Sequence, residues 1–149
     1  MCLILLMPIV TLAQKSNKPQ FTKADTLRGS ITPERAWWNL QHYDIQVRPN
    51  LVDKTIEGSV KIRFKVIRQG KRMQIDLQQP LLIDSVFYLG KKRQLLNCTR
   101  EANVAMINMP FGLKANTEGL VQIYYHGVPR EAIRAPWDGG ISWTKDELG

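Results

Sequence analysis

The chain has 149 residues, of which 44% are hydrophobic and 23% charged, and its formal net charge is +8. This length fits one domain with a substantial core, and the composition excludes a chain that is disordered over most of its length. The basic residues are scattered over predicted strand faces and turns, and the aromatic residues lie mainly on apolar faces or near the two ends of the domain. The charge therefore indicates no specific nucleic-acid partner, only weak attraction to anionic surfaces.

The N-terminus is typical of a targeting segment. Residues 1–14 are predicted to be a signal peptide, because Met1–Ala13 is almost wholly apolar, is too short to span a bilayer and ends in small residues. A buried N-terminal strand is the alternative, which Pro8 and the following polar residues disfavour. Residues 15–26 are polar and are predicted to be a flexible leader. We expect an exported protein, periplasmic or extracellular at the cell surface, with no transmembrane span.

A short helix is predicted to begin at Thr32. Thr32 is a favourable cap, and Pro33 stands at the first helical position. We expect about two turns, continuing to Leu40. Within it, Trp37 and Trp38 are predicted to close one edge of a sheet; an exposed pair that binds sugar is the alternative.

The chain is organised around a long β-hairpin from His42 to Val66, with its turn between Pro49 and Lys54. Apolar and polar residues alternate through both halves, so a period of two predicts one buried face and one solvated, mostly basic face. The predicted buried set is Tyr43, Ile45, Val47, Ile56, Val60, Ile62, Phe64 and Val66.

Further strands are predicted along the rest of the chain, separated by Gly, Pro and Asn turns. They cover Met73–Leu77, Ile83–Leu89, a short Gln94–Cys98, Asn103–Met109 and Val121–His126. In Asn103–Met109 the alternation breaks between Met106 and Ile107, which indicates either a bulge or burial on both faces. Strands of this length predict an all-β fold, either an antiparallel β-sandwich or a saddle-shaped sheet, with one short N-terminal helix.

No catalytic or metal-binding constellation is visible. The two histidines, His42 and His126, lie on the polar faces of different predicted strands, and a zinc site usually needs three protein ligands. Without the signal peptide, Cys98 is the only cysteine, predicted to be a small buried hydrophobe with no neighbouring base. The acidic residues of the strands and turns are isolated, which gives no support for general acid–base chemistry; they include Asp44, Asp76 and Asp84.

The C-terminal stretch contains a predicted turn and a final strand. Trp137-Asp138-Gly139-Gly140 is typical of a turn, in which the Gly-Gly pair allows positive φ. Ile141–Thr144 returns to strand-like alternation, so a last strand is expected there. The letters of Lys145-Asp146-Glu147-Leu148 match an endoplasmic-reticulum retention signal, but Gly149 follows them and we treat the match as chance.

Several runs of the sequence resemble one known family. Thr26–Ser30, Pro33–Trp38 and His42–Ile45 are similar to the opening of exported bacterial zinc aminopeptidases of the aminopeptidase N family. Later runs resemble subsequent strands and the far end of the same N-terminal domain; they are Gln74–Leu77, Ile83–Val86, Tyr125–Pro129, Ala135–Gly140 and Trp143-Thr144. The likeness extends from about Thr26 to the C-terminus and is a whole-domain pattern without a catalytic motif.

The resemblance implies a saddle-shaped, mostly antiparallel β-domain, here residues 27–149, which covers a catalytic domain. In that family the zinc-binding helix, the motif that holds the substrate's amine and the transition-state tyrosine all lie further along the chain. The resemblance therefore implies a truncated or fragmentary domain, incomplete at its C-terminal end. We carry over no catalytic, cofactor-binding or metal-binding residue, and zinc is implied only for the full-length family member.

Two functions follow as expectations. In the first, the chain is the accessory domain of a zinc-dependent aminopeptidase that removes N-terminal residues from peptides, and its partner is the catalytic domain of the parent enzyme. This chain alone is then expected to be inactive. In the second, it is a free-standing β-sandwich that binds carbohydrate or protein through exposed tryptophans. The candidate contacts are Trp37, Trp38, Trp137 and Trp143.

Overall fold

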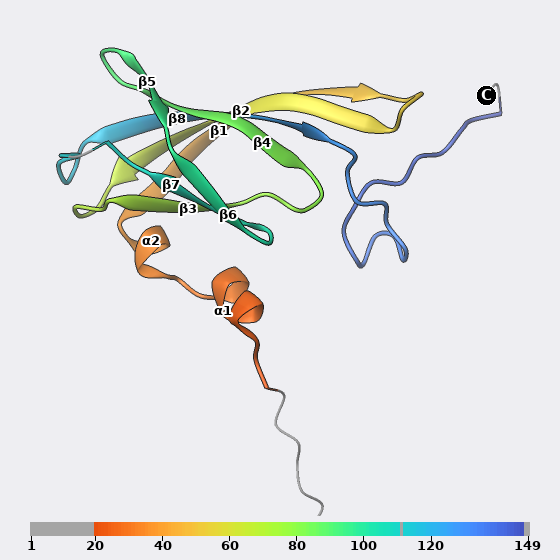
Figure 1. The fold of residues 1–149 in the computed structure, drawn as a ribbon, viewed down its shortest axis with the longest axis horizontal. Coiled ribbons are helices and arrows are strands. Elements are labelled where there is room, and N and C mark those ends of the chain that lie inside the picture. The colour runs from red at the N-terminus through yellow and green to blue at the C-terminus, as the bar shows by residue number, and fades with distance from the viewer. Residues whose placement is uncertain (1–19, 111, 148–149) are drawn as a thin grey trace, which may run out of the picture.

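The computed structural model describes residues 20–110 and 112–147, and these form two antiparallel sheets that pack face to face (Figure 1). The larger sheet has the strand order β1-β2-β8-β4-β5 and the smaller one the order β3-β7-β6. The strands are β1 Trp38–Asn50, β2 Thr55–Val66, β3 Arg72–Asp76, β4 Leu82–Leu89, β5 Arg93–Leu96, β6 Cys98–Glu101, β7 Val104–Asn108 and β8 Glu118–Gly127. The predicted all-β antiparallel architecture is confirmed. No helix in the described residues is long and apolar enough to cross a membrane.

The predicted hairpin is present as β1 and β2, joined by a turn at residues 51–54. The two strands pair along their whole length, from Trp38 opposite Val66 to Asn50 opposite Thr55. One register shift falls between Leu40 and His42, where the extra residue makes a bulge. Because the bulge resets the alternation, Leu40 and Tyr43 point to the same side as the core residues Phe64 and Ile62 although their numbers differ in parity.

The core lies between the two sheets and centres on β2. Phe64 and Val66 are fully buried, and Trp37 is 2% exposed. Trp37 and Trp38 both meet the Phe64 ring edge-on, with ring centroids 5.7 and 5.9 Å apart. The core cluster also contains Ile62, Met73, Val86, Leu96, Ile107, Met109, Val121 and Ile123. The predicted inward face of the second hairpin strand is thus confirmed for Ile62, Phe64 and Val66, and the tryptophan pair packs as expected.

The predicted burial of the first hairpin strand is wrong. Tyr43, Ile45 and Val47 point to the same side as the core, yet they are 45%, 63% and 55% exposed. β1 is an edge strand of the larger sheet, and the three-stranded sheet does not extend beneath this part of it. Alternation assigned the face correctly, but that face remains open where no second layer covers it.

Two helices precede the sheets. α1 spans Lys23–Gly29, where the Thr22 side chain and Asp25 form a reciprocal capping box. The last residues of the segment predicted as a flexible leader are therefore helical. α2 spans only Pro33–Ala36, with Thr32 at its cap position, and is shorter than the predicted two turns because Trp38–Leu40 join β1. The proposed signal peptide, residues 1–14, lies outside the described residues.

One polar residue of the third predicted strand is buried against expectation. Gln74 is 1% exposed on β3. Its side-chain oxygen accepts a hydrogen bond from Thr32 Oγ1 at 2.7 Å, and its Nε2 donates to the Leu27 carbonyl at 2.9 Å. The segment from α1 to α2 lies against this side of the smaller sheet, so both partners belong to the helical segment (Figure 1). Sequence alternation alone could not show that the helices cover this face.

The middle of the chain differs in detail from the prediction. The expected Gln94–Cys98 strand is divided into β5 and β6, and the chain passes from the larger sheet to the smaller one between them. β7 is the central strand of the smaller sheet and is buried on both faces, with Val104, Ala105 and Ile107 at 5% exposure or less. It pairs with both neighbours without a register shift, so burial on both faces explains the broken alternation and a bulge does not.

The expected last strand at Ile141–Thr144 does not form. Only an isolated bridge pairs Ile141 with Glu131, in parallel. The predicted turn before it is confirmed, with Gly139 at φ +67° and Gly140 at φ +106°. This C-terminal arm passes beside the tip of the β1–β2 hairpin (Figure 1), where Lys54 Nζ lies 3.1 Å from Glu131 Oε1.

Candidate functional site

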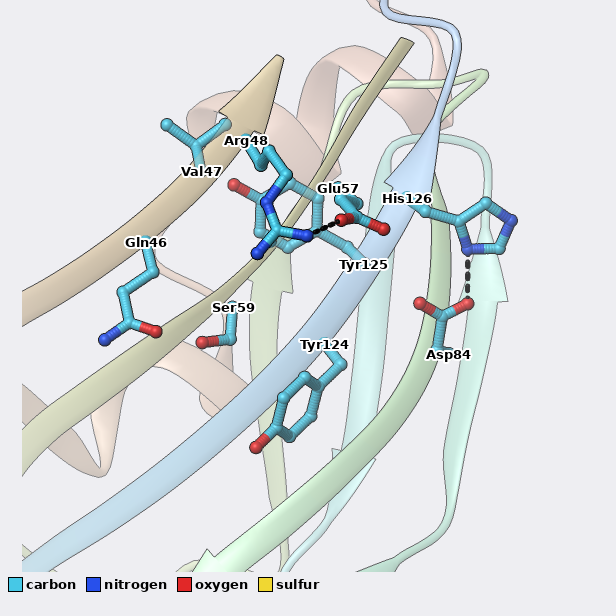
Figure 2. A pocket seen from close by; sticks show the side chains of 10 residues that line it. Gln46, Val47, Arg48, Glu57, Ser59, Asp84, Tyr124, Tyr125 and His126 are labelled. Carbon is cyan, nitrogen blue, oxygen red and sulfur yellow. Dashed lines mark hydrogen bonds and ion pairs between the residues drawn. The ribbon is translucent and has the colours of Figure 1, made fainter. Parts of the chain in front are cut away.

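A polar hollow of about 570 Å³ lies at one end of the larger sheet, where β1, β2, β8 and β4 run side by side (Figure 2). Register places its residues together: Arg48 is opposite Glu57, and Glu57 is opposite His126 on β8. The lining residues are Gln46, Val47, Arg48, Glu57, Gly58, Ser59, Asp84, Tyr124, Tyr125 and His126. We call this surface the polar hollow.

One ion pair and one histidine–carboxylate contact lie in the polar hollow, as the dashed lines in Figure 2 show. Arg48 Nη1 lies 2.9 Å from Glu57 Oε1, and His126 Nδ1 lies 2.5 Å from Asp84 Oδ1. All four side chains are substantially exposed to solvent. The charges of Arg48 and Glu57 compensate each other, and the exposed side chains offer hydrogen-bonding groups to a partner.

The His126–Asp84 pair has the form of an oriented base, but the rest of a catalytic arrangement is missing. In acyl-transfer enzymes the imidazole must also contact a nucleophile. Within residues 20–110 and 112–147, no hydroxyl or thiol is hydrogen-bonded to His126. The contact joins residues 42 positions apart, and no sequence signal pointed to it.

An arginine and two aromatic rings stack beside the polar hollow. Phe87 and Tyr124 meet edge-on with centroids 6.1 Å apart, and the Arg93 guanidinium carbon lies 3.7 Å from the Phe87 centroid. The same carbon lies 5.8 Å from the Tyr124 ring. A guanidinium over a ring face is an attractive contact. The hollow is thus flanked by an aromatic wall on β4 and β8.

An apolar groove of about 720 Å³ opens on the other face of the larger sheet, between β1 and β3. Its walls include Tyr43 and Ile45 from β1, Ile75 from β3 and Ile31 before α2. Burial, together with the nearby Asp76 charge, raises the pKa of the Tyr43 hydroxyl above its ordinary value, so this group stays protonated at neutral pH. We call this surface the apolar groove.

The four candidate tryptophans are in different environments. Trp37 is buried and donates a hydrogen bond to the Arg72 carbonyl at 2.6 Å, so it cannot contact a ligand. Trp38 lines the apolar groove and donates to the Glu34 carbonyl at 3.0 Å. Trp143 is half-buried, and its indole N–H is enclosed without a hydrogen-bond partner in the described part of the chain. Trp137 is 87% exposed, which makes it the most accessible of the four.

Asp138 fixes the loop that carries Trp137. Its carboxylate accepts hydrogen bonds from the backbone N–H of Ile133 at 2.7 Å and of Arg134 at 3.0 Å. The Arg130 guanidinium also lies 3.3 Å from Asp138 Oδ2. The Ile133 N–H, followed by Arg134 and the Arg130 charge, lowers the pKa of the Asp138 carboxyl below its ordinary value despite partial desolvation. The loop is therefore held by an ionised carboxylate at neutral pH.

The described residues do not fit a zinc site. His42 pairs with Arg63 and His126 with Glu57, so the two histidines lie at separate places on the larger sheet. No group of three or more His, Cys, Asp or Glu side chains that could hold a metal ion occurs in the described ranges. Cys98 is half-buried against the core, and this burial raises the pKa of its thiol although Arg100 opposes the shift. A protonated thiol is a poor nucleophile and a poor metal ligand.

Known proteins resemble this chain in structure but show no match in sequence. No protein-family model matches the sequence, and no curated protein matches it. Among solved structures, an M1 zinc metallopeptidase mutant from Deinococcus radiodurans bound to a Tyr-Ser-Ala substrate superposes on 65% of this chain with a TM-score of 0.56 and 19% sequence identity. The M1 zinc metallopeptidase from the same organism covers 62% with a TM-score of 0.54 and 20% identity.

A third neighbour, a two-domain M1 zinc metallopeptidase mutant bound to L-arginine, covers 64% of the chain with a TM-score of 0.55 and 21% identity. The matched region is 21–22% of these proteins, so the chain spans about a fifth of their length. This chain has the fold of part of an M1 zinc metallopeptidase. At these identities the likeness concerns the fold and assigns no catalytic residue.

Proposed function

We propose that this chain is the N-terminal accessory β-domain of an exported zinc aminopeptidase of the aminopeptidase N family. The observation that carries the proposal is the superposition of its β-sandwich on M1 zinc metallopeptidases over about two thirds of the chain. The family resemblance of the sequence, from about Thr26 to the C-terminus, supports the same assignment. The complete enzyme would hydrolyse N-terminal residues from peptides.

In this proposal the chain positions a catalytic domain and performs no chemistry itself. Metal-assisted peptide hydrolysis requires an ion that polarises the carbonyl and a carboxylate that moves protons. The histidines of this chain lie apart, and the described residues hold no metal cluster. We assign docking on the catalytic domain to the polar hollow, since its Arg48–Glu57 ion pair, its His126–Asp84 contact and the aromatic wall beside it suit a mixed interface between domains.

The DNA downstream of the Gly149 codon tests the assignment. An in-frame or frame-shifted sequence that encodes a helix with two zinc-binding histidines four residues apart supports an aminopeptidase origin. A downstream region with no trace of such a helix contradicts it. Export is tested by mass spectrometry of the protein from its own host: a start near Gln14 or Lys15 supports the signal peptide, and a retained Met1 on exported material contradicts it.

The docking role is tested with the two histidines of the larger sheet. His126→Ala removes a side chain of the polar hollow, whereas His42→Ala removes a histidine that does not line it. Calorimetric titration of each variant with a separately produced catalytic domain should show weaker binding for His126→Ala, by about tenfold, or about 1.4 kcal/mol. Equal affinities for the two variants would place the interface elsewhere.

The purified chain should release no amino acid from aminoacyl chromogenic substrates, with or without added zinc. Zinc-dependent turnover that disappears on replacement of His42 and His126 would overturn the accessory role.

One observation favours a second function, a free-standing binding module. Trp137 is 87% exposed on a loop that Asp138 holds in place, and an accessible ring on a fixed loop is a common platform for sugar or protein ligands. Trp137→Ala should abolish binding in a glycan or peptide screen while leaving the melting temperature unchanged. Unchanged binding by that variant would exclude this platform.

A further inference from the structure

Among the described residues no strand pairs with the outer edge of β1, and this free edge forms one continuous surface with the apolar groove. β1 is the outer strand of the larger sheet, and its inward side chains Tyr43, Ile45 and Val47 stay roughly half exposed. β3, which forms the facing wall of the groove, is likewise an outer strand of its own sheet. The sandwich is therefore open along this side, where both layers end in an edge. A long edge with exposed apolar side chains is a site for strand pairing.

The backbone of β1 shows which residues offer hydrogen bonds at the free edge. The Gln46 carbonyl points at β2, since a Cβ placed on Gly58 would lie only 2.2 Å from that oxygen. Backbone groups alternate in direction along a strand, so Ile45 and Val47 present their N–H and C=O groups outward. Pro49 also faces outward, because its position has the same parity as Ile45 and Val47. A proline facing β2 would lack the N–H that the β1–β2 ladder needs, so the outward position leaves that ladder intact.

We propose that the free edge of β1 pairs antiparallel with the β1 strand of a second copy of this chain, with a two-fold axis at Gln46. This register places Ile45 of each copy beside Val47 of the other, which extends the larger sheets into one and joins the two apolar strips. It also places Asp44 of each copy opposite Arg48 of the other. The surface is thus self-complementary in hydrogen bonding, apolar contact and charge.

The arrangement of charges distinguishes the register with its axis at Gln46 from the register with its axis one residue earlier, at Ile45. Within one copy, Asp44 lies 3.0 Å from Lys61 Nζ and Arg48 lies 2.9 Å from Glu57. Pairing across the axis at Gln46 joins these into a row of alternating charges from Lys61 of one copy to Glu57 of the other. An axis at Ile45 would instead place Arg48 opposite His42 and leave Asp44 opposite Gln46, without a charge partner across the axis. Complementary charge therefore favours the axis at Gln46.

A pair of charge reversals tests the register in the full chain. Asp44→Arg and Arg48→Asp should each give monomers in sedimentation analysis, because like charges then face each other across the axis. An equimolar mixture of the two variants should recover the dimer, since every cross-axis pair in the mixed dimer is again opposite in charge. Mixing cannot repair a folding defect within a chain, so this recovery separates pairing from damage to the hairpin.

Matched substitutions at the two edges of the larger sheet test the surface itself. Ile45→Lys on β1 and Leu95→Lys on β5 change residues of nearly equal exposure, 63% and 64%. Ile45→Lys should raise the dimer dissociation constant at least about tenfold, because two lysines are then buried per dimer, and Leu95→Lys should leave it unchanged.

The proposal would be overturned if the wild-type chain sediments as a monomer up to about millimolar concentration. A dissociation constant above about 1 mM would mean that the association is too weak to matter. Equal effects of the two lysine substitutions on the dissociation constant would also overturn it. The same holds if each charge-reversal variant forms dimers without the other. The proposal does not depend on the peptidase assignment, and its tests involve only this chain.

Discussion

The two strands of the central hairpin have the same alternation of apolar and polar residues, but their apolar side chains are buried on one strand and exposed on the other. On β2, Ile62, Phe64 and Val66 are 2% exposed or less, whereas on β1, Tyr43, Ile45 and Val47 are about half exposed on the same face. β2 lies between two strands and above the smaller sheet, and β1 is an edge strand over the apolar groove. The strand's place in the sheet therefore decides how much an apolar residue contributes to stability.

The largest effect is expected at the centre of β2. Phe64→Ala should lower the free energy of unfolding by about 3–5 kcal/mol, because the fully buried ring supports both Trp37 and Trp38 and its loss leaves a cavity. Denaturant melts measure this loss. A change below about 1 kcal/mol, which is typical of surface positions, would place the core elsewhere.

Overpacking beside the same ring should have an intermediate effect. A Cβ on Gly119, which pairs with Phe64 across the β2–β8 ladder, would lie 2.3 Å from the Phe64 Cζ atom. Gly119→Ala should therefore cost about 1–3 kcal/mol as the ring shifts. Gly29→Ala is the matched control, since no atom lies within 4 Å of its added Cβ. Equal losses in thermal melts of the two variants would contradict the tight packing at Phe64.

On β1 the same kind of truncation should cost little. Ile45→Ala, measured at protein concentrations low enough to exclude self-association, should change the unfolding free energy by about 0.5 kcal/mol, because the side chain already contacts water. A loss near that of Phe64→Ala would show that another layer covers β1 in solution.

The smallest effect is expected on the solvated face of β2. Lys65 is exposed between Phe64 and Val66, so Lys65→Ala should change stability by about 0.5 kcal/mol or less. A loss comparable to that of Phe64→Ala would mean that the register of the hairpin is wrong.

The sequence predicted correctly which face of each strand is apolar, but it did not predict which of these faces another part of the chain covers. The alternation around Phe64 identified the core side, and the Gly-Gly turn after Asp138 adopted the expected positive φ. Gln74 is buried because α1 and α2 lie against β3. Ile45 is exposed because the smaller sheet does not extend over β1. Both are properties of how elements assemble, which no local pattern encodes.

The candidate site was less predictable than the fold. His126 and Asp84 were each visible as polar residues on predicted strands, but their contact requires β8 to lie beside β4. The polar hollow likewise unites the β1–β2 hairpin with β4 and β8, which lie further along the chain. Trp137 could be named from the sequence as a candidate contact, and packing of Trp37 was expected, but the sequence did not identify Phe64 as its partner.

Residue-level hydrogen exchange tests the contrast between β1 and β2 most directly. In dilute protein, the outward amides of Ile45 and Val47 should exchange at least about tenfold faster than those of Asp44, Gln46 and the residues of β2, because only the latter donate into a ladder. At high concentration, protection of Ile45 and Val47 should rise as copies pair. Uniform protection along β1 in dilute monomeric protein would contradict the open edge on which this account depends.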